Sequence, residues 1–324
     1  MTAEGPAGQD VAAVGAVADP PDHDEIPDVA AVVVTYNSAH VVGELLDSLP
    51  AALDGLAARI VVVDNGSSDG TVDLIEARSD IVIVRSANQG YSAGINTGIR
   101  AAGQARSILV LNPDVVMRPG SIRLMVEAMS THRTGIVAPR IEDRDGVLQL
   151  SLRREPTLRR ALGLSATGLA CFSEHVGRTE DYELPRSVDW ALGAVLLVSW
   201  ECHERVGEWD ESFFLYSEET DYSMRARERG LLTRYEPRAV AVHIGQQSGH
   251  NDLTHSMQII NRVRFYRRRH GAFASTGYLL ATVATETGWW LLRGAGQSRT
   301  AVIALLSPKR RPPQLGPTGG LLPH

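Results

Sequence analysis

The sequence of 324 residues has little cysteine and no long apolar run, and both shortages exclude classes of protein. Its two cysteines, Cys171 and Cys202, cannot build a disulfide framework or a four-cysteine zinc site, so we expect both to be buried thiols. No run reaches the roughly 18 apolar residues of a membrane-spanning helix, and no basic-then-apolar secretion signal is found near the N-terminus. These absences predict residence in the cytoplasm.

Two common nucleotide-binding motifs are also missing. No G-x-G-x-x-G follows the first apolar run and no G-x-x-x-x-G-K-[ST] occurs. The sequence therefore lacks the usual motifs of enzymes that transfer hydride and of P-loop enzymes that transfer phosphoryl groups. The composition is that of a globular protein, with 44% hydrophobic and 22% charged residues. Because compact α/β folds commonly reach about 250 residues, we expect one main domain with appendages.

Charge is divided unevenly along the chain. Residues 261–324 hold ten basic residues and one acid, a net charge of +9, and because the whole chain carries −6, residues 1–260 carry −15. Basic C-terminal segments of this kind bind phosphates or anionic lipids. The basic residues do not interleave with a recognisable nucleic-acid-binding module, so no nucleic-acid partner is expected.

Two basic clusters flank an amphipathic stretch, 278–292, that contains Trp289 and Trp290. An apolar stretch between basic residues is typical of an element that lies in the membrane interface. It predicts peripheral contact with the anionic inner face of the cell membrane, and a solvated helix face that packs back on the core is the alternative. The clusters are Arg262, Arg264, Arg267, Arg268 and Arg269 on one side and Lys309, Arg310 and Arg311 on the other.

Three segments are expected along the chain. Residues 1–28, rich in Ala, Gly, Pro and Asp, predict a disordered leader. Residues 29–250 alternate short apolar strands with helices, which predicts a parallel sheet with right-handed crossovers. Residues 251–324 predict a basic helical extension. The expected strands are 30–35, 59–64, 81–84, 108–111, 188–198 and 239–243, and the expected helices are 41–49, 71–77, 92–102, 218–228, 253–269 and 276–292.

Polar residues follow three of these strands. Asp64 can accept the N3–H of uracil or thymine, and Asp114 can hold a hard divalent cation that in turn grips a diphosphate. Because parallel strands end at one edge of the sheet, these groups converge there and suit a nucleoside diphosphate. Each motif alone is also a common turn or helix cap. The strand ends are Thr35-Tyr36-Asn37, Asp64-Asn65-Gly66 and Asn112-Pro113-Asp114.

Two further segments carry residues suited to chemistry. Small residues at the start of the helix after Asn88 let the backbone approach a ligand and leave N–H groups free for an anion, and tight helix packing is the alternative. Glu218, Glu219 and Asp221 occupy a first helical turn, where the helix dipole favours acids whether or not they take part in catalysis.

Taken together, the motifs over 29–249 resemble, in order and spacing, the inverting family 2 glycosyltransferases of GT-A fold, and among them the bacterial rhamnosyltransferases. The motifs are VVVTYN, VVDNGSSDGT, NQGYSAGINTGI, LNPD, VDWALGAVLLV, GEWDESFFLYSEETDYSMRARERG and VHIGQQS. The resemblance implies an α/β fold with a mostly parallel central sheet flanked by helices, followed here by the C-terminal helical extension.

The resemblance also implies a role for each matching residue. Asp64 binds the nucleotide base, and Glu219, the second acid of the pair, is the catalytic base. Asp114 and His243 hold the divalent metal, Mg²⁺ or Mn²⁺, with a buried or capping histidine as the alternative for His243. The acceptor residues are Trp190, Gly193 and Glu218, and the donor-binding residues are Thr35, Tyr36, Asn37, Asp64, Asn65, Gly66, Asn88, Gly90, Tyr91, Ser92, Gly94, Asn96, Asn112 and Asp114.

Two residues depart from the family pattern. Asn112 stands where the metal motif has its first acid, and it can bond to ribose but brings no charge to the cation. Glu219 stands where the catalytic pair has aspartate, so its carboxylate must be set back by about one methylene.

The implied reaction is metal-assisted transfer of a hexosyl group, L-rhamnose from dTDP-rhamnose before others, to a hydroxyl of a lipid-linked or cell-surface glycan in one displacement. A galactofuranosyl or other hexosyl transfer from a UDP-sugar is the alternative reaction. A non-catalytic nucleotide-sugar-binding module is the alternative outside the enzymes.

Overall fold

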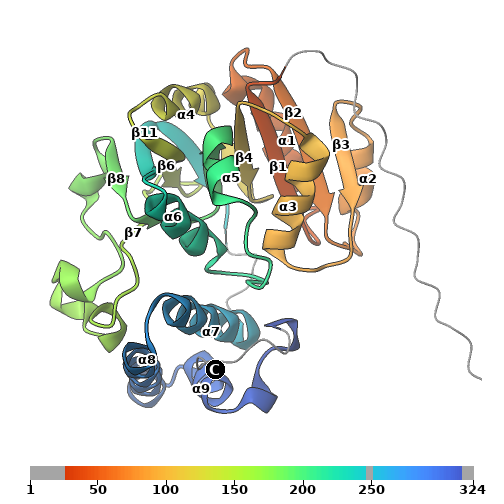
Figure 1. Ribbon diagram of the computed structural model, residues 1–324. Coiled ribbons are helices and arrows are strands. Elements are labelled where there is room, and N and C mark those ends of the chain that lie inside the picture. Colours follow the sequence, from red (N-terminus) through yellow and green to blue (C-terminus); the bar gives the residue numbers. More distant parts are fainter. Residues whose placement is uncertain (1–25, 246–250, 316–324) are drawn as a thin grey trace, which may run out of the picture.

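The computed structural model of the chain describes residues 26–245 and 251–315. They form a sheet flanked by helices and a layer of C-terminal helices that lies beyond one edge of the sheet (Figure 1). The expected leader, apart from residues 26–28, and the end of the VHIGQQS motif lie outside the described residues.

The first half of the sheet alternates parallel strands with helices, as expected. Strand β1 is buried along its whole length because it pairs with β2 and β4 and is covered on both faces. Val33 packs into the core under α1 and α4, whereas Val32 packs into the core under α3. The elements are β1 (Val29–Thr35), α1 (Val42–Leu53), β2 (Ala58–Asp64), α2 (Thr71–Glu76), β3 (Ile81–Arg85), α3 (Tyr91–Ala102) and β4 (Ser107–Leu111).

The second half of the sheet mixes strand directions. The strands follow the order β3-β2-β1-β4-β10-β6-β11-β5, with β10 antiparallel to both β4 and β6. The elements are β5 (Val115–Met117), α4 (Ser121–Met129), β6 (Thr134–Glu142), β7 (Leu152–Arg153), β8 (Arg186–Val188), β9 (Trp190–Ala191), β10 (Val195–Ser199), α5 (Trp200–Val206), α6 (Glu218–Glu228) and β11 (Leu232–His243). A mostly parallel α/β sheet is therefore confirmed.

Two strands differ from their expected bounds. The run 188–198 is not one strand, because its middle turns away from the sheet: the N–H of Leu192 bonds to Ser151 and the carbonyl of Ala194 accepts from Asn112. Strand β11 begins at Leu232, earlier than expected, and its pairing with β6 shifts register between Glu236 and Val240. Neither α4 nor β6 was among the expected elements.

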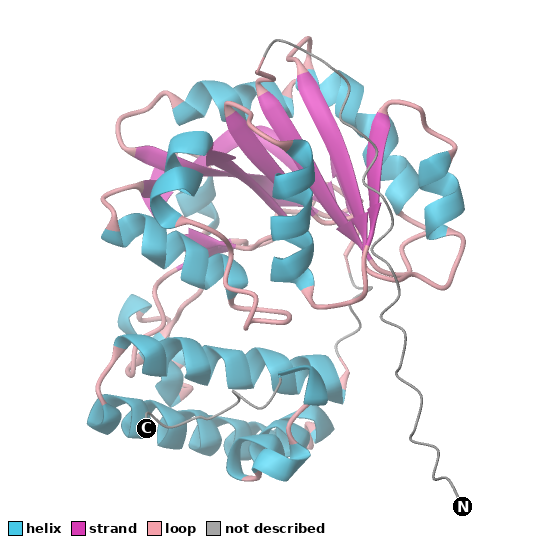
Figure 2. Cartoon of the chain, turned by 45° about the vertical axis from the view of Figure 1, so that its right-hand side comes forward, coloured by secondary structure: helices cyan, strands magenta, loops and turns pink. Residues whose placement is uncertain are grey.

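The C-terminal layer consists of α7 (Asp252–Arg269), α8 (Ala272–Arg293) and α9 (Gly296–Leu306), which pack around a small core of their own. Figure 2 shows α7 lying between the sheet domain and the other two helices. One short 3-10 turn of the sheet domain, η1 (Arg160–Leu162), contacts α8 at one side of this layer. The other 3-10 turns are η2 (Ser165–Thr167), η3 (Ala170–Phe172) and η4 (Thr179–Tyr182), and η5 (Pro308–Arg310) and η6 (Pro313–Leu315) follow α9.

Four of the five arginines of α7 bond to the sheet domain, so the expectation that this cluster is free to meet lipid is wrong for Arg262, Arg264, Arg268 and Arg269. Arg262 bonds to Glu174, and Arg268 bonds to Asp210. Arg264 is buried and donates to the carbonyl of Ser212 at 3.0 Å. The acidic residues of the sheet domain attract this basic helix. The helix packs on the core, which was the alternative to membrane contact.

Two further expectations are settled by the fold. Cys202 lies on the inner face of α5 and is buried as expected, but Cys171 is exposed, because it lies in a 3-10 turn at the surface. Within residues 26–245 and 251–315, no helix has the length and hydropathy to cross a bilayer.

Candidate active site

The polar residues expected to carry chemistry lie along the carboxyl edge of the sheet. Strands β1 and β2 end level with each other, since Thr35 pairs with Asp64. Antiparallel strand β10 starts at this edge, where Val195 pairs with Leu111 at the end of β4. Strand β11, which runs parallel to β6, ends there with His243. The topology therefore gathers segments that are far apart in the sequence.

Asp64 ends β2 and shapes the turn that follows it. Its buried carboxylate accepts hydrogen bonds from the hydroxyls of Thr35 and Ser67 and from the N–H groups of Gly66 at 3.1 Å and Ser67 at 2.9 Å. A carboxylate offers about four lone-pair positions, so the turn uses all of them. A nucleotide base would have to displace a donor, and the half-buried Ser67 hydroxyl is the accessible one.

Two asparagines link the loops at this edge. Asn37, whose φ of 52° is left-handed, accepts from the N–H of Ser68 at 2.8 Å and so ties the loop after β1 to the loop after β2. Asn65 donates to the carbonyl of Gly90 at 3.2 Å and so reaches the start of α3. Between them, the ring of Tyr36 is left exposed on the surface of the edge.

The start of α3 packs against the loop 209–214. The N–H of Tyr91 donates to the carbonyl of Phe214 at 2.7 Å, and the Ser92 hydroxyl donates to the carbonyl of Phe213 at 3.1 Å. A Cβ added at Gly90 would lie 2.6 Å from the Phe214 carbonyl oxygen, so only glycine allows this approach. The small residue here serves packing between two segments of the chain.

The rest of this segment gives the same result. Asn96 both donates to the carbonyl of Trp209 and accepts from its N–H, each at 2.9 Å. A Cβ at Gly94 would lie 2.6 Å from Val34, so Gly94 lets α3 pack closely on β1. The carboxamide of Asn88 accepts from the N–H of Gly90, at 3.2 Å. Tight packing, the alternative interpretation of this segment, is what the structure shows for Gly94 and Asn96.

Asn112, Asp114 and His243 meet where β4 ends. The side-chain oxygen of Asn112 accepts a hydrogen bond of 2.7 Å from the Tyr91 hydroxyl. The buried Asp114 carboxylate lies 3.3 Å from Nε2 of His243. Burial and the nearby charges of Glu218, Asp114 and Glu219 raise the pKa of Tyr91 well above its usual value, so the start of α3 is close to all three carboxylates.

Asp114 and His243 suit a divalent cation that keeps other ligands. Among the described residues, no group of three or more His, Cys, Asp or Glu side chains is placed to hold a metal ion. One carboxylate and one imidazole cannot enclose an ion, but Mg²⁺ typically takes one or two carboxylates and leaves its other positions to water and phosphate oxygens. The donor set therefore fits an ion shared with a bound phosphate.

Helix α6 begins from an unusual turn. Tyr216 and Ser217 both have positive φ, 70° and 74°, which costs conformational energy in residues other than glycine. Asn261, fully buried on α7, donates to the carbonyls of Leu215 at 2.9 Å and Tyr216 at 3.2 Å. The C-terminal layer thus holds the turn that sets the first residues of α6, and the sequence pattern did not single out Asn261.

The two acids that start α6 lie close to each other. Burial raises the pKa of Glu218 well above its usual range, and the charge of Glu219 adds to the rise. Burial also raises the pKa of Glu219, opposed by hydrogen bonds from the start of the helix and by the Arg153 guanidinium. Each residue leaves one buried carboxylate oxygen without a hydrogen-bond partner in the described chain. Such oxygens are able to take up a proton.

Gly193 faces Glu219 from the turn before β10. A Cβ at Gly193 would lie 3.4 Å from Cβ of Glu219, so the two residues are in direct contact range. The next residue, Ala194, accepts the N–H of Asn112 at 2.9 Å, which connects the glutamate to the end of β4. Trp190 is buried instead, and its indole N–H donates to the carbonyl of Arg154 at 3.0 Å. Trp190 therefore supports the site from behind.

Arg153 is a residue that sequence reasoning missed. It lies on β7, opposite Trp190 on β9, with its guanidinium 6.0 Å from the Trp190 ring centroid. Burial lowers its pKa, and the charges of Tyr182, Glu174 and Glu219 oppose that change. The short strand carrying it gave no signal, because only the fold brings residue 153 near residue 219.

Asp221, another acid in the first turn of α6, is engaged elsewhere. Its carboxylate pairs with Arg225 at 2.7 Å on the same helix and with Arg269 of α7 at 3.3 Å. Both of its oxygens are thus occupied by guanidinium groups. Glu218 and Glu219 each keep a free carboxylate oxygen, and Glu219 also contacts Gly193.

Comparison with known proteins identifies relatives that share this architecture. Residues 30–180 match the profile of glycosyl transferase family 2. An N-acetylglucosaminyl-diphospho-decaprenol L-rhamnosyltransferase of Mycobacterium tuberculosis is 32% identical over 231 residues, which cover 65% of this chain and 74% of that protein. The low-salt glycan biosynthesis hexosyltransferase Agl10 of Haloferax volcanii is 31% identical over 210 residues, 64% of each protein.

The fold has counterparts among solved structures. That of GalNAc-T7 with UDP, GalNAc and Mn²⁺ superposes with a TM-score of 0.60 at 15% identity, covering 82% of this chain and 52% of that one. At this identity the likeness concerns the fold, which is that of the GT-A glycosyltransferases, as expected.

Proposed function

Because the chain belongs to glycosyl transferase family 2, we propose that it moves a hexosyl group from a nucleoside-diphosphate sugar to an acceptor hydroxyl, with inversion at the transferred carbon. The observation that carries this proposal is the position of Glu219. Its carboxylate has a free buried oxygen, stands beside Gly193 and shares the sheet edge with the Asp114 and His243 pair.

Glu219 acts as the base. A carboxylate with a raised pKa is a stronger base. It therefore takes up the proton of an attacking hydroxyl more effectively than an ordinary surface acid does. Gly193 leaves room above the carboxylate for the acceptor, since a side chain there would contact Glu219. The Arg153 guanidinium opposes the rise that burial causes in the pKa of Glu219 and so favours its ionised form.

Asp114 and His243 face the leaving group. They would hold Mg²⁺ or Mn²⁺, which when bound supplies positive charge to the departing diphosphate. Asn112 fixes the Tyr91 hydroxyl beside them and carries no charge of its own. With one anionic ligand, Asp114 contributes most of the protein's attraction for the ion.

The donor's base and ribose lie over the ends of β1 and β2. Asp64 accepts the base N–H when Ser67 gives way, and the exposed Tyr36 ring offers a face for stacking. Thr35, Asn37, Asn65 and Gly66 shape the loops around Asp64.

The sugar and the acceptor are taken from the class of the relatives. The mycobacterial relative is named for L-rhamnosyl transfer to a decaprenol-linked sugar diphosphate. We assign dTDP-rhamnose as donor and a lipid-linked glycan as acceptor, which places the enzyme at the cytoplasmic face of the cell membrane. A UDP-hexose or UDP-galactofuranose is the second donor class, because the residues assigned to the donor at the carboxyl edge of the sheet contact the nucleotide and not the sugar.

One experiment tests the proposal. The full-length protein is incubated with Mn²⁺, a lipid-linked glycan acceptor and each of a panel of dTDP- and UDP-sugars, and the product and its anomeric configuration are read by mass spectrometry and NMR. We expect an inverted rhamnosyl product with dTDP-rhamnose. Product from a UDP-sugar alone would replace the donor assignment, and donor binding without transfer or hydrolysis for the whole panel would leave only a nucleotide-sugar-binding module.

A further inference from the structure

Helix α8 has apolar residues on both its inner and its outer face. Its buried positions are Ser275, Tyr278 and Glu286, and Leu279 and Val283 pack partly buried against the C-terminal core. Phe273, by contrast, is 95% exposed and Leu280 is 62% exposed. A surface helix in water has its apolar stripe against the core alone, so the outer apolar residues need an explanation.

The outward residues form one stripe along α8. Positions 273, 276, 280, 284, 287 and 291 recur at three- and four-residue steps and so lie on one face of the helix. The residues are Phe273, Thr276, Leu280, Ala284, Thr287 and Leu291; none is charged, and all are exposed except the half-buried Thr287. Glu286, the acid of this helix, is buried and bonds to His255 at 2.9 Å. From Phe273 to Leu291 the stripe is about 27 Å long.

The C-terminal end of α8 carries an aromatic and basic rim. Arg293 lies over the ring of Trp289 at 4.2 Å from its centroid, and Arg299 of α9 lies over Trp290 at 5.7 Å. Beside them, Leu292 is 87% exposed. Indole rings and guanidinium groups together are typical of the boundary between lipid headgroups and acyl chains.

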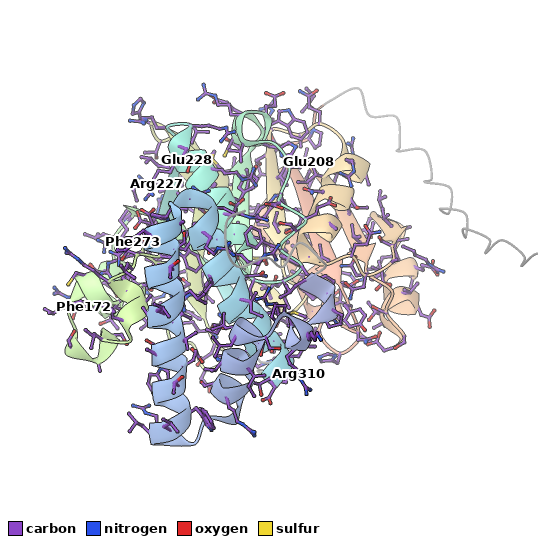
Figure 3. The ribbon with its side chains drawn as sticks, turned by 60° about the horizontal axis from the view of Figure 1, so that its bottom comes forward. Phe172, Glu208, Arg227, Glu228, Phe273 and Arg310 are labelled. Atoms are coloured by element: carbon purple, nitrogen blue, oxygen red, sulfur yellow. The ribbon has the colours of Figure 1, made fainter. Side chains whose placement is uncertain are left out.

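The exposed charges after α7 have one sign. Within the described residues 272–315 the exposed charged side chains are basic: Arg293 and Arg299 belong to the rim, and Lys309 and Arg310 follow α9. On α9, Ile303 is 41% exposed and Leu306 is 64% exposed. Figure 3 shows α8 along the near face with Phe273 toward one end, and Arg310 across the C-terminal layer from it.

We infer that the outward face of α8, with the adjoining end of α9, docks on an anionic lipid bilayer, where α8 lies in the plane of the interface. An uncharged stripe inserts among acyl chains, and the basic rim meets the anionic headgroups. Charged or polar groups commonly fix how a protein partner is oriented on a surface. The only polar residues of this stripe are two threonines, which favours lipid over a protein partner. The inference deepens the lipid-linked acceptor of the proposed function, but its test does not depend on activity.

The experiment measures binding to vesicles by sedimentation. Wild type and the variant F273E/L280E/L291E are mixed with vesicles of phosphatidylcholine, or of phosphatidylcholine with phosphatidylglycerol. The three positions are exposed, so the substitutions disturb no core. A matched control, L74E/V147E/L184E, adds the same charges at exposed apolar residues of the sheet domain. We expect wild type and the control to bind the anionic vesicles, and the α8 variant to bind at least about tenfold more weakly, since each buried charge opposes insertion.

A second measurement covers the case in which the α8 variant misfolds. Brominated acyl chains should quench the tryptophan fluorescence of wild type, and W289F/W290F should remove most of that quenching. The α8 variant should also keep full activity on a short soluble acceptor, so failure of docking and failure of the transferase proposal give different results.

Three outcomes would overturn the inference. The first is wild type that stays in the supernatant with both kinds of vesicle at low salt. The second is equal binding by the α8 variant and the control. The third is a wild-type dimer in size-exclusion chromatography that F273E/L280E/L291E separates, in which case a second copy of the chain covers this face.

Discussion

At the residue scale, the proposed chemistry depends on one proton. We expect Glu219→Gln to lower kcat by about 10²–10⁴-fold, because the amide keeps the size of the side chain but takes up no proton. Steady-state kinetics with the donor would show the loss in kcat and little change in KM. Glu228→Gln, at the other end of the same helix, is the control and should stay active. A Glu219→Gln enzyme within about tenfold of wild type would return the role to Glu218.

Burial sets the pH at which Glu219 works. It raises the pKa of Glu219, so the activity of wild type should rise with pH as Glu219 loses its proton. The charge of Glu219 in turn raises the pKa of Glu218 well above its usual range, so Glu218 still holds its proton where Glu219 ionises. Glu218→Gln therefore replaces one neutral group by another, and the acid limb of the profile of kcat/KM against pH should stay close to that of wild type. A clear shift of the acid limb to lower pH in this variant would show that Glu218 ionises before Glu219.

The raised pKa values of Glu218 and Glu219 also make the stability of the fold depend on pH. The folded pair holds its protons more tightly than the unfolded chain does. Its contribution to the free energy of unfolding is therefore present below the ordinary glutamate pKa of about 4.3 and is lost as pH rises through the raised folded value. Glu218→Gln should weaken this decline, as chemical denaturation across that pH range would detect.

A third residue-scale prediction concerns the cation. We expect EDTA to stop transfer, and Asp114→Ala to remain inactive when Mn²⁺ is restored, because Asn112 offers no second charge. His243→Ala should regain part of its activity at high Mn²⁺, since the carboxylate remains. Titration of Mn²⁺ binding by electron paramagnetic resonance checks both variants, and full activity of wild type in EDTA would remove the metal from the proposal.

At the scale of elements, α7 supports the start of α6. Asn261→Ala removes two hydrogen bonds to a strained turn and leaves buried carbonyls unpaired, a loss of about 1–3 kcal/mol. We expect a lower melting temperature and a fall in kcat of about tenfold, because Glu219 loses its fixed position. Gln258→Ala on the same helix is the control. Wild-type kinetics in Asn261→Ala would show that the turn holds itself.

Elements also differ in how well the sequence predicts them. β1 and β2 are short, β-branched and buried, and their apolar runs identify them almost to the residue. The run 188–198 looks equally continuous, but Leu192 and Ala194 pair with other segments, so only the fold reveals the break. Glu219 could be predicted from its motif, whereas Arg153 and Asn261 act through contacts between elements distant in sequence, which no local pattern records.

At the scale of the whole molecule, part of the basic charge of the tail is neutralised inside the protein. Arg262, Arg268 and Arg269 neutralise Glu174, Asp210 and Asp221 of the sheet domain. The net charge of +9 therefore predicted an attraction correctly but not its partner, because a sequence does not show which acids the fold will bring near. The membrane surface inferred here depends on the apolar stripe of α8 instead.

We expect the sheet domain and the C-terminal layer to unfold together. Differential scanning calorimetry should give one transition, and a chain ended at residue 250 should be insoluble, because Phe213 and the acids that pair with α7 would be exposed. Two separate transitions, or a soluble truncated chain that still hydrolyses the donor, would show that the layers are independent. R293Q/R299Q, at the far end of the layer, should leave the transition temperature nearly unchanged.

The loop 209–214 is held from both sides, by α3 and by α7. Tyr91 and Ser92 bond to its last two carbonyls, and Arg264 bonds to the carbonyl of Ser212. Because both helices hydrogen-bond to this loop, a shift of the loop at α3 also strains its hydrogen bonds to α7. Two binding events that each order this loop are thermodynamically linked, and the factor by which one tightens the other is the same in both directions. Donor occupancy at the sheet edge would then raise lipid affinity at α8, and a bilayer would raise donor affinity by an equal factor.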